Sequence, residues 1–119
     1  VLWKQGHMLT IDYGETFPQL YYRRPKGTIR SYFFQQRYES LQEILSRPGL
    51  QDITADVDFT DIRQRMKSET VEEIKYIKQS EFINVHATKL AKLDPSISED
   101  GAGSAFKVLW HQKIPKREN

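Results

Sequence analysis

Alternating acidic and hydroxyl side chains lie near the middle of this 119-residue chain, within Gln51-Asp52-Ile53-Thr54-Ala55-Asp56-Val57-Asp58-Phe59. In an extended segment Asp52, Thr54, Asp56 and Asp58 would lie on one side. Carboxylates so close together repel one another unless cations or N–H groups face them. The pattern therefore predicts either a site for a cationic group or an exposed acidic loop. Capping of a following helix would explain Asp58 alone.

A second pair of candidates, Asp12 and Tyr13, ends the short apolar run that begins at Met8 and precedes Gly14. The length of this run and the glycines around it predict a buried strand. In open α/β sheets the carboxyl ends of the strands face the ligand crevice. We expect Asp12 and Tyr13 at such a crevice, Tyr13 as a wall of a substrate or cofactor pocket. The alternative for Asp12 is a strand-end residue bonded to a neighbouring loop.

Positive charge is concentrated in one segment of the chain. Residues 17–37 hold five basic residues and no acidic one, whereas the rest of the chain is net acidic. Basic and aromatic residues interleave over 21–37, which is the composition of a platform for single-stranded nucleic acid. The alternative is a solvated loop and strand whose aromatic side chains pack inward. The net charge of +2 is too small to indicate nucleic acid, so an RNA- or protein-binding module remains the second hypothesis.

Several kinds of site are excluded by composition and spacing. Cysteine is absent, which excludes disulfides, thiolate nucleophiles and cysteine-bound zinc. The histidines His7, His86 and His111 are too scattered for a metal site, and no Ser-His-Asp order occurs with a recognisable nucleophile elbow. The only Gly-x-Gly, at 101–103, precedes a predicted strand instead of opening a helix, so it predicts a turn rather than a nucleotide loop.

The sequence contains no apolar run of the roughly 20 residues that a membrane span requires. We expect a cytoplasmic protein that does not contact membranes. The N-terminal residues have no signal-peptide core, and we expect the chain to begin within a domain.

The elements that would position the candidate residues follow from periodicity and from start and stop signals. Residues 15–27 are predicted as loop, and residues 71–78 fit both a helical stripe and an alternating strand. The other predicted elements are a strand over 28–33, a helix over 39–45, a helix over 59–68 capped by Asp58, a helix capped by Ser80 that ends near Leu93, a polar loop over 96–104, and a strand over 106–110.

The order of the motifs resembles that of the MidA-like family of methyltransferases, which is related to the mitochondrial complex I assembly arginine methyltransferase. The matching stretches are Gly6-His-Met-Leu-Thr-Ile-Asp12-Tyr13-Gly14, Gly27-Thr28-Ile29-Arg30-Ser31-Tyr32, Pro48-Gly49, Asp52 to Phe59, Ile77-Lys78-Gln79 with Glu81-Phe82-Ile83, and Gly103 to Leu109. Family members often carry a histidine where this chain has Gln35 and Gln36, so no role is transferred there.

The resemblance implies an α/β fold that is the C-terminal part of a Rossmann-like methyltransferase sheet. Residues 8–13, 71–78 and 106–110 would be strands five, six and seven, which favours strand for 71–78. A small hairpin and helical substrate module would be inserted after the fifth strand. Residues 1–119 would then be one part of the domain, with the cofactor-binding half N-terminal to residue 1.

The resemblance also implies the chemistry. The parent protein would transfer a methyl group from S-adenosylmethionine to an arginine of a partner protein by in-line displacement, a reaction that depends on positioning. Carboxylates would hold the guanidinium, and the catalytic candidates are Asp12, Tyr13, Asp52, Thr54 and Asp56. We expect no cofactor-binding residue and no metal ligand in this chain, and no activity of the chain alone. It should associate with itself or with the missing half.

Overall fold

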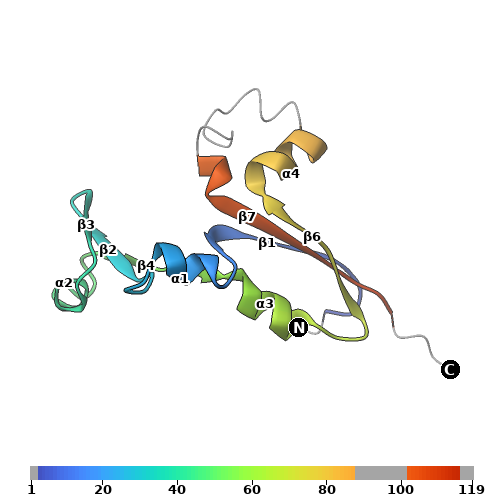
Figure 1. The fold of residues 1–119 in the computed structure, drawn as a ribbon, viewed down its shortest axis with the longest axis horizontal. Helices are drawn as coiled ribbons and strands as arrows, with labels where there is room; N and C mark the ends of the chain where they lie inside the picture. The colour runs from blue at the N-terminus through green and yellow to red at the C-terminus, as the bar shows by residue number, and fades with distance from the viewer. Residues whose placement is uncertain (1–2, 88–101, 116–119) are drawn as a thin grey trace.

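The computed structural model describes residues 3–87 and 102–115, which form two sheets and several short helices (Figure 1). Their principal extents are 57 × 36 × 29 Å. None of the helices in these two ranges is long and apolar enough to cross a membrane. The helices are α1 (Gln19–Arg23), α2 (Leu41–Leu45), α3 (Phe59–Met66), α4 (Gln79–His86) and a 3₁₀ turn, Ala102–Ser104.

The larger sheet has four strands in the spatial order β5-β1-β7-β6. The strands are β1 (Gly6–Glu15), β5 (Val57–Asp58), β6 (Val71–Lys78) and β7 (Phe106–Lys113). β7 lies between β1 and β6 and is antiparallel to both, whereas β5 is parallel to the end of β1. The three strands predicted in this part of the chain are confirmed, and the ambiguous segment 71–78 is a strand.

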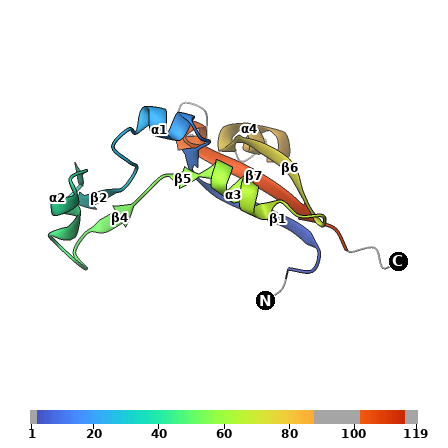
Figure 2. The ribbon, with the colours of Figure 1, turned by 60° about the horizontal axis from the view of Figure 1, so that its bottom comes forward.

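Helices α3 and α4 lie on opposite faces of this sheet (Figures 1 and 2). The ring of Phe59 in α3 lies 5.3 Å from that of Tyr76, whose cross-strand partner is Leu109. The ring of Phe82 in α4 lies 6.2 Å from that of Trp110. Because successive residues of a strand point to opposite faces, Leu109 and Trp110 place the two helices on different sides. Phe59 and Leu109 are fully buried and form the centre of the core on the α3 side.

The start of α3 is fixed by a side-chain cap, as predicted. Asp58 Oδ1 accepts hydrogen bonds from the N–H groups of Thr60, at 2.9 Å, and Asp61, at 3.4 Å. These bonds satisfy amide groups that have no partner within the helix. The helix ends at Met66, two residues before the predicted end, because Lys67 has an extended backbone.

His111 on β7 is 2 % exposed, and its Nδ1 has no hydrogen-bond partner among residues 3–87 and 102–115. Burial lowers the pKa of His111 below its usual value of 6.5, while Glu73 acts to raise this pKa and Arg63 to lower it. The folded chain therefore holds a proton on this ring less readily than the unfolded chain. As the pH falls through about 6.5, the unfolded chain takes up this proton more fully than the folded chain, so the free energy of unfolding should decrease.

This prediction can be checked by denaturant unfolding at about pH 7.5 and about pH 5.5, a range that lies above the titration of most carboxylates. The decrease should be reduced in His111→Gln, in which the titrating ring is absent. It should persist in His86→Gln, which removes an exposed histidine and leaves His111 in place. An equal decrease in all three proteins would contradict the assignment to His111.

One half of the larger sheet is uncovered on the α4 side. Leu9 and Ile11 of β1 pair with Trp110 and Val108, which places them on this face, yet they are 44 % and 45 % exposed. The adjacent edge of β1 is also open: among the described residues it is paired, through β5, only at its last two residues. The strand was predicted to be buried, and this face of it is not.

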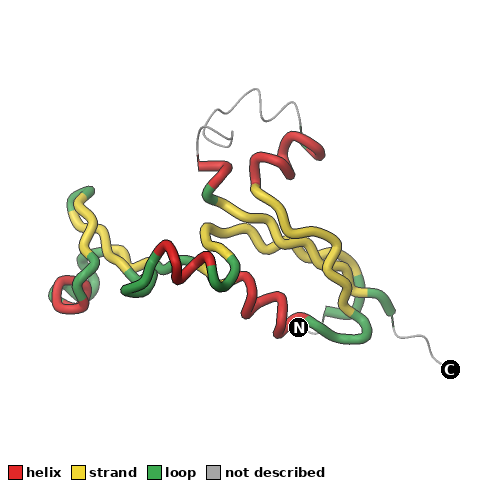
Figure 3. Tube along the Cα trace, viewed as in Figure 1, coloured by secondary structure: helices red, strands yellow, loops and turns green. Residues whose placement is uncertain are grey.

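The smaller sheet has the order β3-β2-β4 and lies at one end of the molecule together with α2 (Figure 3). Its strands are β2 (Arg30–Phe33), β3 (Gln36–Tyr38) and β4 (Asp52–Thr54). The guanidinium of Arg47 lies over the rings of Phe33 and Tyr38, 4.7 and 5.1 Å from their centroids. Together with Ile44, which is 2 % exposed, these contacts hold α2 against the sheet. The predicted strand over 28–33 and helix over 39–45 are confirmed with slightly later starts.

Two local predictions are wrong. Residues 15–27 were predicted as loop but contain the helix α1, which buries Leu20. The helix was missed because one and a half turns between two prolines are too short to show a helical period. Ser80 does not cap α4: Lys78 occupies the N-cap position, where its side chain does not cap the helix, and Ser80 lies buried inside the helix. The predicted continuation of this helix towards Leu93 and most of the loop over 96–104 lie outside the described residues.

Candidate functional site

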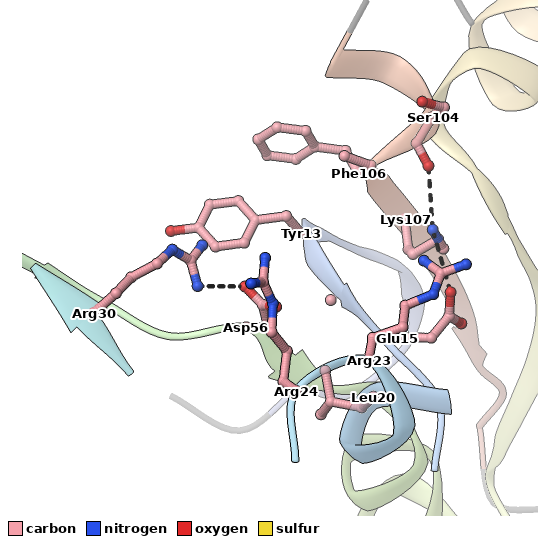
Figure 4. A pocket seen from close by; sticks show the side chains of 12 residues that line it. Tyr13, Glu15, Leu20, Arg23, Arg24, Arg30, Asp56, Ser104, Phe106 and Lys107 are labelled. Carbon is pink, nitrogen blue, oxygen red and sulfur yellow. Dashed lines mark hydrogen bonds and ion pairs between the residues drawn. The ribbon is translucent and has the colours of Figure 1, made fainter. Parts of the chain in front are cut away.

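A cavity of about 620 Å³ opens at the carboxyl end of β1, between the larger and the smaller sheet (Figure 4). β1 contributes Tyr13, Gly14 and Glu15, and the start of β7 contributes Phe106 and Lys107. The rest of the wall comes from α1 and the residue after it, from β2, from the segment before β5, and from Ser104 and Ala105 ahead of β7. Its charged lining residues are Glu15, Arg23, Arg24, Arg30, Asp56 and Lys107.

Arg30 and Asp56 form a buried ion pair at the wall of this cavity. Arg30 Nη1 donates a hydrogen bond of 2.7 Å to Asp56 Oδ1, and the two side chains are only 9 % and 15 % exposed. Arg30 also donates to the carbonyl of Thr28 at 2.9 Å and to the hydroxyl of Tyr32 at 3.2 Å. Burial alone would lower the pKa of Arg30, but the bonds to Tyr32 and Asp56 raise it. Arg30 is therefore a fixed positive charge.

The ring of Tyr13 forms an adjoining part of the wall and is held on three sides. The Arg30 guanidinium carbon lies 5.2 Å from the centroid of the ring, and the Phe106 ring lies nearly perpendicular to it with the two centroids 5.4 Å apart. The hydroxyl of Tyr13 forms a hydrogen bond with the hydroxyl of Thr54. Tyr13 thus joins the end of β1 to both β2 and β4, and these contacts fix its orientation.

Glu15 is the second carboxylate of the cavity. It accepts hydrogen bonds from the Thr16 N–H at 3.0 Å and the Tyr76 hydroxyl at 3.3 Å, and Lys107 Nζ lies 3.7 Å away. Burial acts to raise the pKa of Glu15, but the Thr16 bond, Lys107, the Tyr76 bond and the charge of Arg23 together lower it. Glu15 is therefore an anion already engaged with the protein. Burial and the charge of Glu15 raise the pKa of Tyr76.

The structure brings together three of the five predicted site residues: Tyr13, Thr54 and Asp56. Asp12 lies one residue away on β1, and its Oδ1 accepts a hydrogen bond of 2.8 Å from the Tyr13 N–H. It is not among the residues that line the cavity. Asp52 is exposed in the smaller sheet, where it pairs with Tyr32.

The acidic segment does not form one extended face, because the chain passes from the smaller sheet to the larger sheet between Thr54 and Val57. Asp52 stays with the smaller sheet, Asp56 turns to Arg30, and Asp58 caps α3. The cationic partner that the sequence required for Asp56 is thus a side chain of this same protein.

Sequence reasoning missed Glu15, Arg30 and Lys107 as members of the site. Glu15 follows the Asp-Tyr-Gly motif, and its position at a strand end was an available signal. Arg30 lies inside the basic segment, where charge alone did not distinguish it from its neighbours. Lys107 was visible only as a polar residue in an apolar strand.

The aromatic residues of segment 21–37 do not share one face. Tyr21 packs against Phe17, with ring centroids 6.0 Å apart, whereas Phe33 and Phe34 pack against each other in the smaller sheet. Tyr22 is exposed on α1. This distribution gives no specific support to a nucleic-acid platform, which stays a prediction. Among the described residues, no group of three or more histidine, aspartate or glutamate side chains is placed to hold a metal ion.

Comparison with known proteins gives three matches. The sequence model of a family described as putative S-adenosyl-L-methionine-dependent methyltransferase matches residues 2–77. A COG1565 superfamily member from Burkholderia thailandensis, in a crystal structure bound to S-adenosyl-homocysteine, is 28% identical with a TM-score of 0.72. That match covers 91% of this chain and 32% of that one.

A second crystal structure, of an uncharacterized COG1565 superfamily protein from the same organism, is 28% identical with a TM-score of 0.74, over 92% of this chain and 33% of that one. This chain thus spans about a third of the length of the solved structures it matches. No curated protein matches it.

Proposed function

This chain belongs to the family of putative S-adenosyl-L-methionine-dependent methyltransferases, and on that basis we propose that it is the C-terminal part of a larger methyltransferase domain. In this proposal β1, β6 and β7 are the fifth, sixth and seventh strands of the sheet. The spatial order β1-β7-β6, with β7 antiparallel to both neighbours, supports it most directly. The segment between β1 and β5, which contains α1, α2 and the smaller sheet, would be the inserted substrate module.

The complete protein that contains this chain would use S-adenosylmethionine as methyl donor. The described residues do not fit this cofactor by themselves. The two carboxylates of the cavity already bind groups of the protein, Asp56 with Arg30 and Glu15 with Thr16 and Tyr76, and the one Gly-x-Gly of the sequence, at 101–103, precedes a strand instead of opening a helix. We therefore assign no cofactor contact to this chain and propose that its residues contact the substrate.

The proposed substrate is an arginine of a partner protein, as the resemblance to MidA-like enzymes implies. A guanidinium is held best by a carboxylate that forms charged hydrogen bonds in a fixed orientation. Asp12 is the available group, because its side chain forms no ion pair with a described residue. Tyr13, Thr54 and Asp56 would position the wall beside it, and Asp52 would contact the partner protein from the smaller sheet.

Calorimetric titration with S-adenosylmethionine tests the proposal. The complete protein should bind the cofactor and transfer a labelled methyl group to an arginine-containing protein. This chain alone should show no measurable binding. Micromolar affinity of the isolated chain would overturn the assignment of the cofactor contacts to the rest of the protein, and a complete protein without affinity would overturn the function.

Asp12→Asn in the complete protein should lower the turnover rate at least about tenfold, because a charged hydrogen bond to the substrate contributes on the order of 1.5–3 kcal/mol. Cofactor affinity and melting temperature should change little, since asparagine keeps the oxygen that accepts from the Tyr13 N–H. Glu72→Gln, at an exposed position of β6, is the matched control. Unchanged turnover in folded Asp12→Asn would remove Asp12 from the site, whereas a lower melting temperature with preserved turnover would assign it a structural role.

The open edge of β1 and the exposed Leu9 and Ile11 are the proposed contact with the rest of the sheet. An unpaired strand edge beside an uncovered apolar face favours association. The isolated chain should therefore self-associate or bind the other half of the protein. A monodisperse monomer in light scattering, with a sharp cooperative melt, would contradict this.

A further inference from the structure

The cavity at the end of β1 carries more positive than negative charge. Four cationic side chains and two carboxylates line it, so two positive charges are not compensated by lining carboxylates. Both carboxylates have close partners on the protein: Asp56 is bonded to Arg30, and Glu15 to Tyr76 with Lys107 beside it. Arg23 and Arg24 interact with these carboxylates only more weakly: Arg24 lies 3.9 Å from Asp56, and Arg23 acts on Glu15 through its charge.

The uncompensated charges belong to the last residue of α1 and the residue after it, Arg23 and Arg24. The side chain of Arg23 forms no hydrogen bond or ion pair with residues 3–87 or 102–115. Arg24 lies at 3.9 Å from both Asp56 and Glu39, at the outer limit of an ion pair, and is 38 % exposed. Figure 4 shows both side chains rising from α1 beside the cavity.

A second, smaller cavity of about 180 Å³ shares this basic edge. Arg23 and Arg24 line it as well, together with Lys26, Arg37 and a single carboxylate, Glu39. Arg37 pairs with Glu39. Arg23 and Arg24, which lack a strong partner among the described residues, therefore line both cavities, and the charged side chains that line each cavity are net positive.

We propose that Arg23 and Arg24 bind acidic side chains of the methyl-accepting protein, next to the residue that is methylated. This inference rests on the proposed function and adds a feature by which the enzyme would recognise its protein substrate. A guanidinium presents a planar pair of donors that matches a carboxylate. Carboxylates fit better than single-stranded RNA, because the aromatic residues of segment 21–37 do not share one face on which bases could stack.

The experiment compares two labelled peptides that contain a central arginine and differ only in two flanking residues, aspartates in one and asparagines in the other. Binding to the complete protein is followed by fluorescence anisotropy without cofactor, so the result does not depend on methyl transfer. The acidic peptide should bind about tenfold more tightly, as expected for one or more charged hydrogen bonds. The difference should shrink as salt is added.

Arg23→Gln should reduce this preference to about twofold or less, since the variant keeps a polar side chain and loses the charge. Arg23 makes no side-chain bond that the fold requires among the described residues, so the variant should fold. Lys67→Gln is the matched control, because it removes the same charge from an exposed residue at the far end of α3 and should keep the full preference.

Equal binding of the two peptides, or equal loss in Arg23→Gln and Lys67→Gln, would overturn the inference. So would a uridine oligonucleotide that binds in an Arg23-dependent way while the acidic peptide shows no advantage. Methyl transfer measured on the same preparation separates the two proposals: an active enzyme without acidic preference refutes only this inference. A protein with the preference but without cofactor binding refutes only the proposed reaction.

Discussion

Replacing Gly14 by alanine should separate β5 from β1 and disable the site. A Cβ built at this position would fall inside the contact distance of the Val57 carbonyl oxygen, and would lie 2.8 and 2.9 Å from the Val57 nitrogen and carbonyl carbon. All three atoms belong to the backbone of Val57, so a change of side-chain rotamer cannot relieve the clash. Because Gly14 and Val57 are paired in the sheet, the backbone of one strand must move.

The displacement would reach the cavity directly, since Asp56 precedes β5 and Tyr13 precedes Gly14. A shift of about 1 Å in a positioning group can reduce a rate about a hundredfold. We expect a loss of that order in methyl transfer by the complete protein, together with a destabilisation of roughly 1–3 kcal/mol from overpacking.

Gly49→Ala is the control for this variant, because open space surrounds that position although its φ is +76°. It should cost about 1 kcal/mol from the left-handed backbone alone and leave methyl transfer nearly unchanged. Turnover and melting temperature measured on both variants distinguish the two effects. Full activity in Gly14→Ala would show that the close approach of β5 to β1 is not required.

Replacing Arg30 by methionine should destabilise the smaller sheet and its attachment to the larger one. The variant leaves the carboxylate of Asp56 largely buried without its partner, which costs about 3 kcal/mol. It also removes the cation over the ring of Tyr13. Denaturant unfolding of the complete protein measures the loss, and proteolysis within residues 16–56 shows whether this region opens first.

Two further variants make this prediction specific. Arg37→Met removes the same charge from the neighbouring strand, where the ion pair with Glu39 is largely exposed, and should cost less than about 1 kcal/mol. The double variant Arg30→Met with Asp56→Leu removes both buried charges and should recover much of the lost stability. Equal effects of Arg30→Met and Arg37→Met would show that burial of the pair contributes nothing.

The larger sheet could be predicted because its signals are local. Apolar runs marked the strands, and Asp58, a residue type that caps helices, marked the start of α3. Only the family resemblance decided in favour of a strand for 71–78, since seven of its eight residues pair along β7 through contacts that no local pattern contains.

The candidate site was less predictable because its partners are distant in the chain. Arg30 and Asp56 are 26 residues apart, and Tyr13 and Thr54 are 41 apart. An even spacing of acidic residues suggested a single extended face, but the chain turns between the two sheets at this point. The role of Gly14 also depends on a strand that begins more than forty residues later.

The return of the chain to the larger sheet has a consequence for how such proteins diversify. The segment over 16–56 leaves from Glu15 and comes back at Val57, and these two ends lie side by side on one parallel pairing. Any segment whose ends meet at this spacing allows β1 and β5 to form the same pairing. The entropic cost of closing a longer loop grows only slowly with its length. A segment of another length could therefore close the same pairing while β1 and β5 remain as they are, and under the proposed function such an exchange would change the recognised partner.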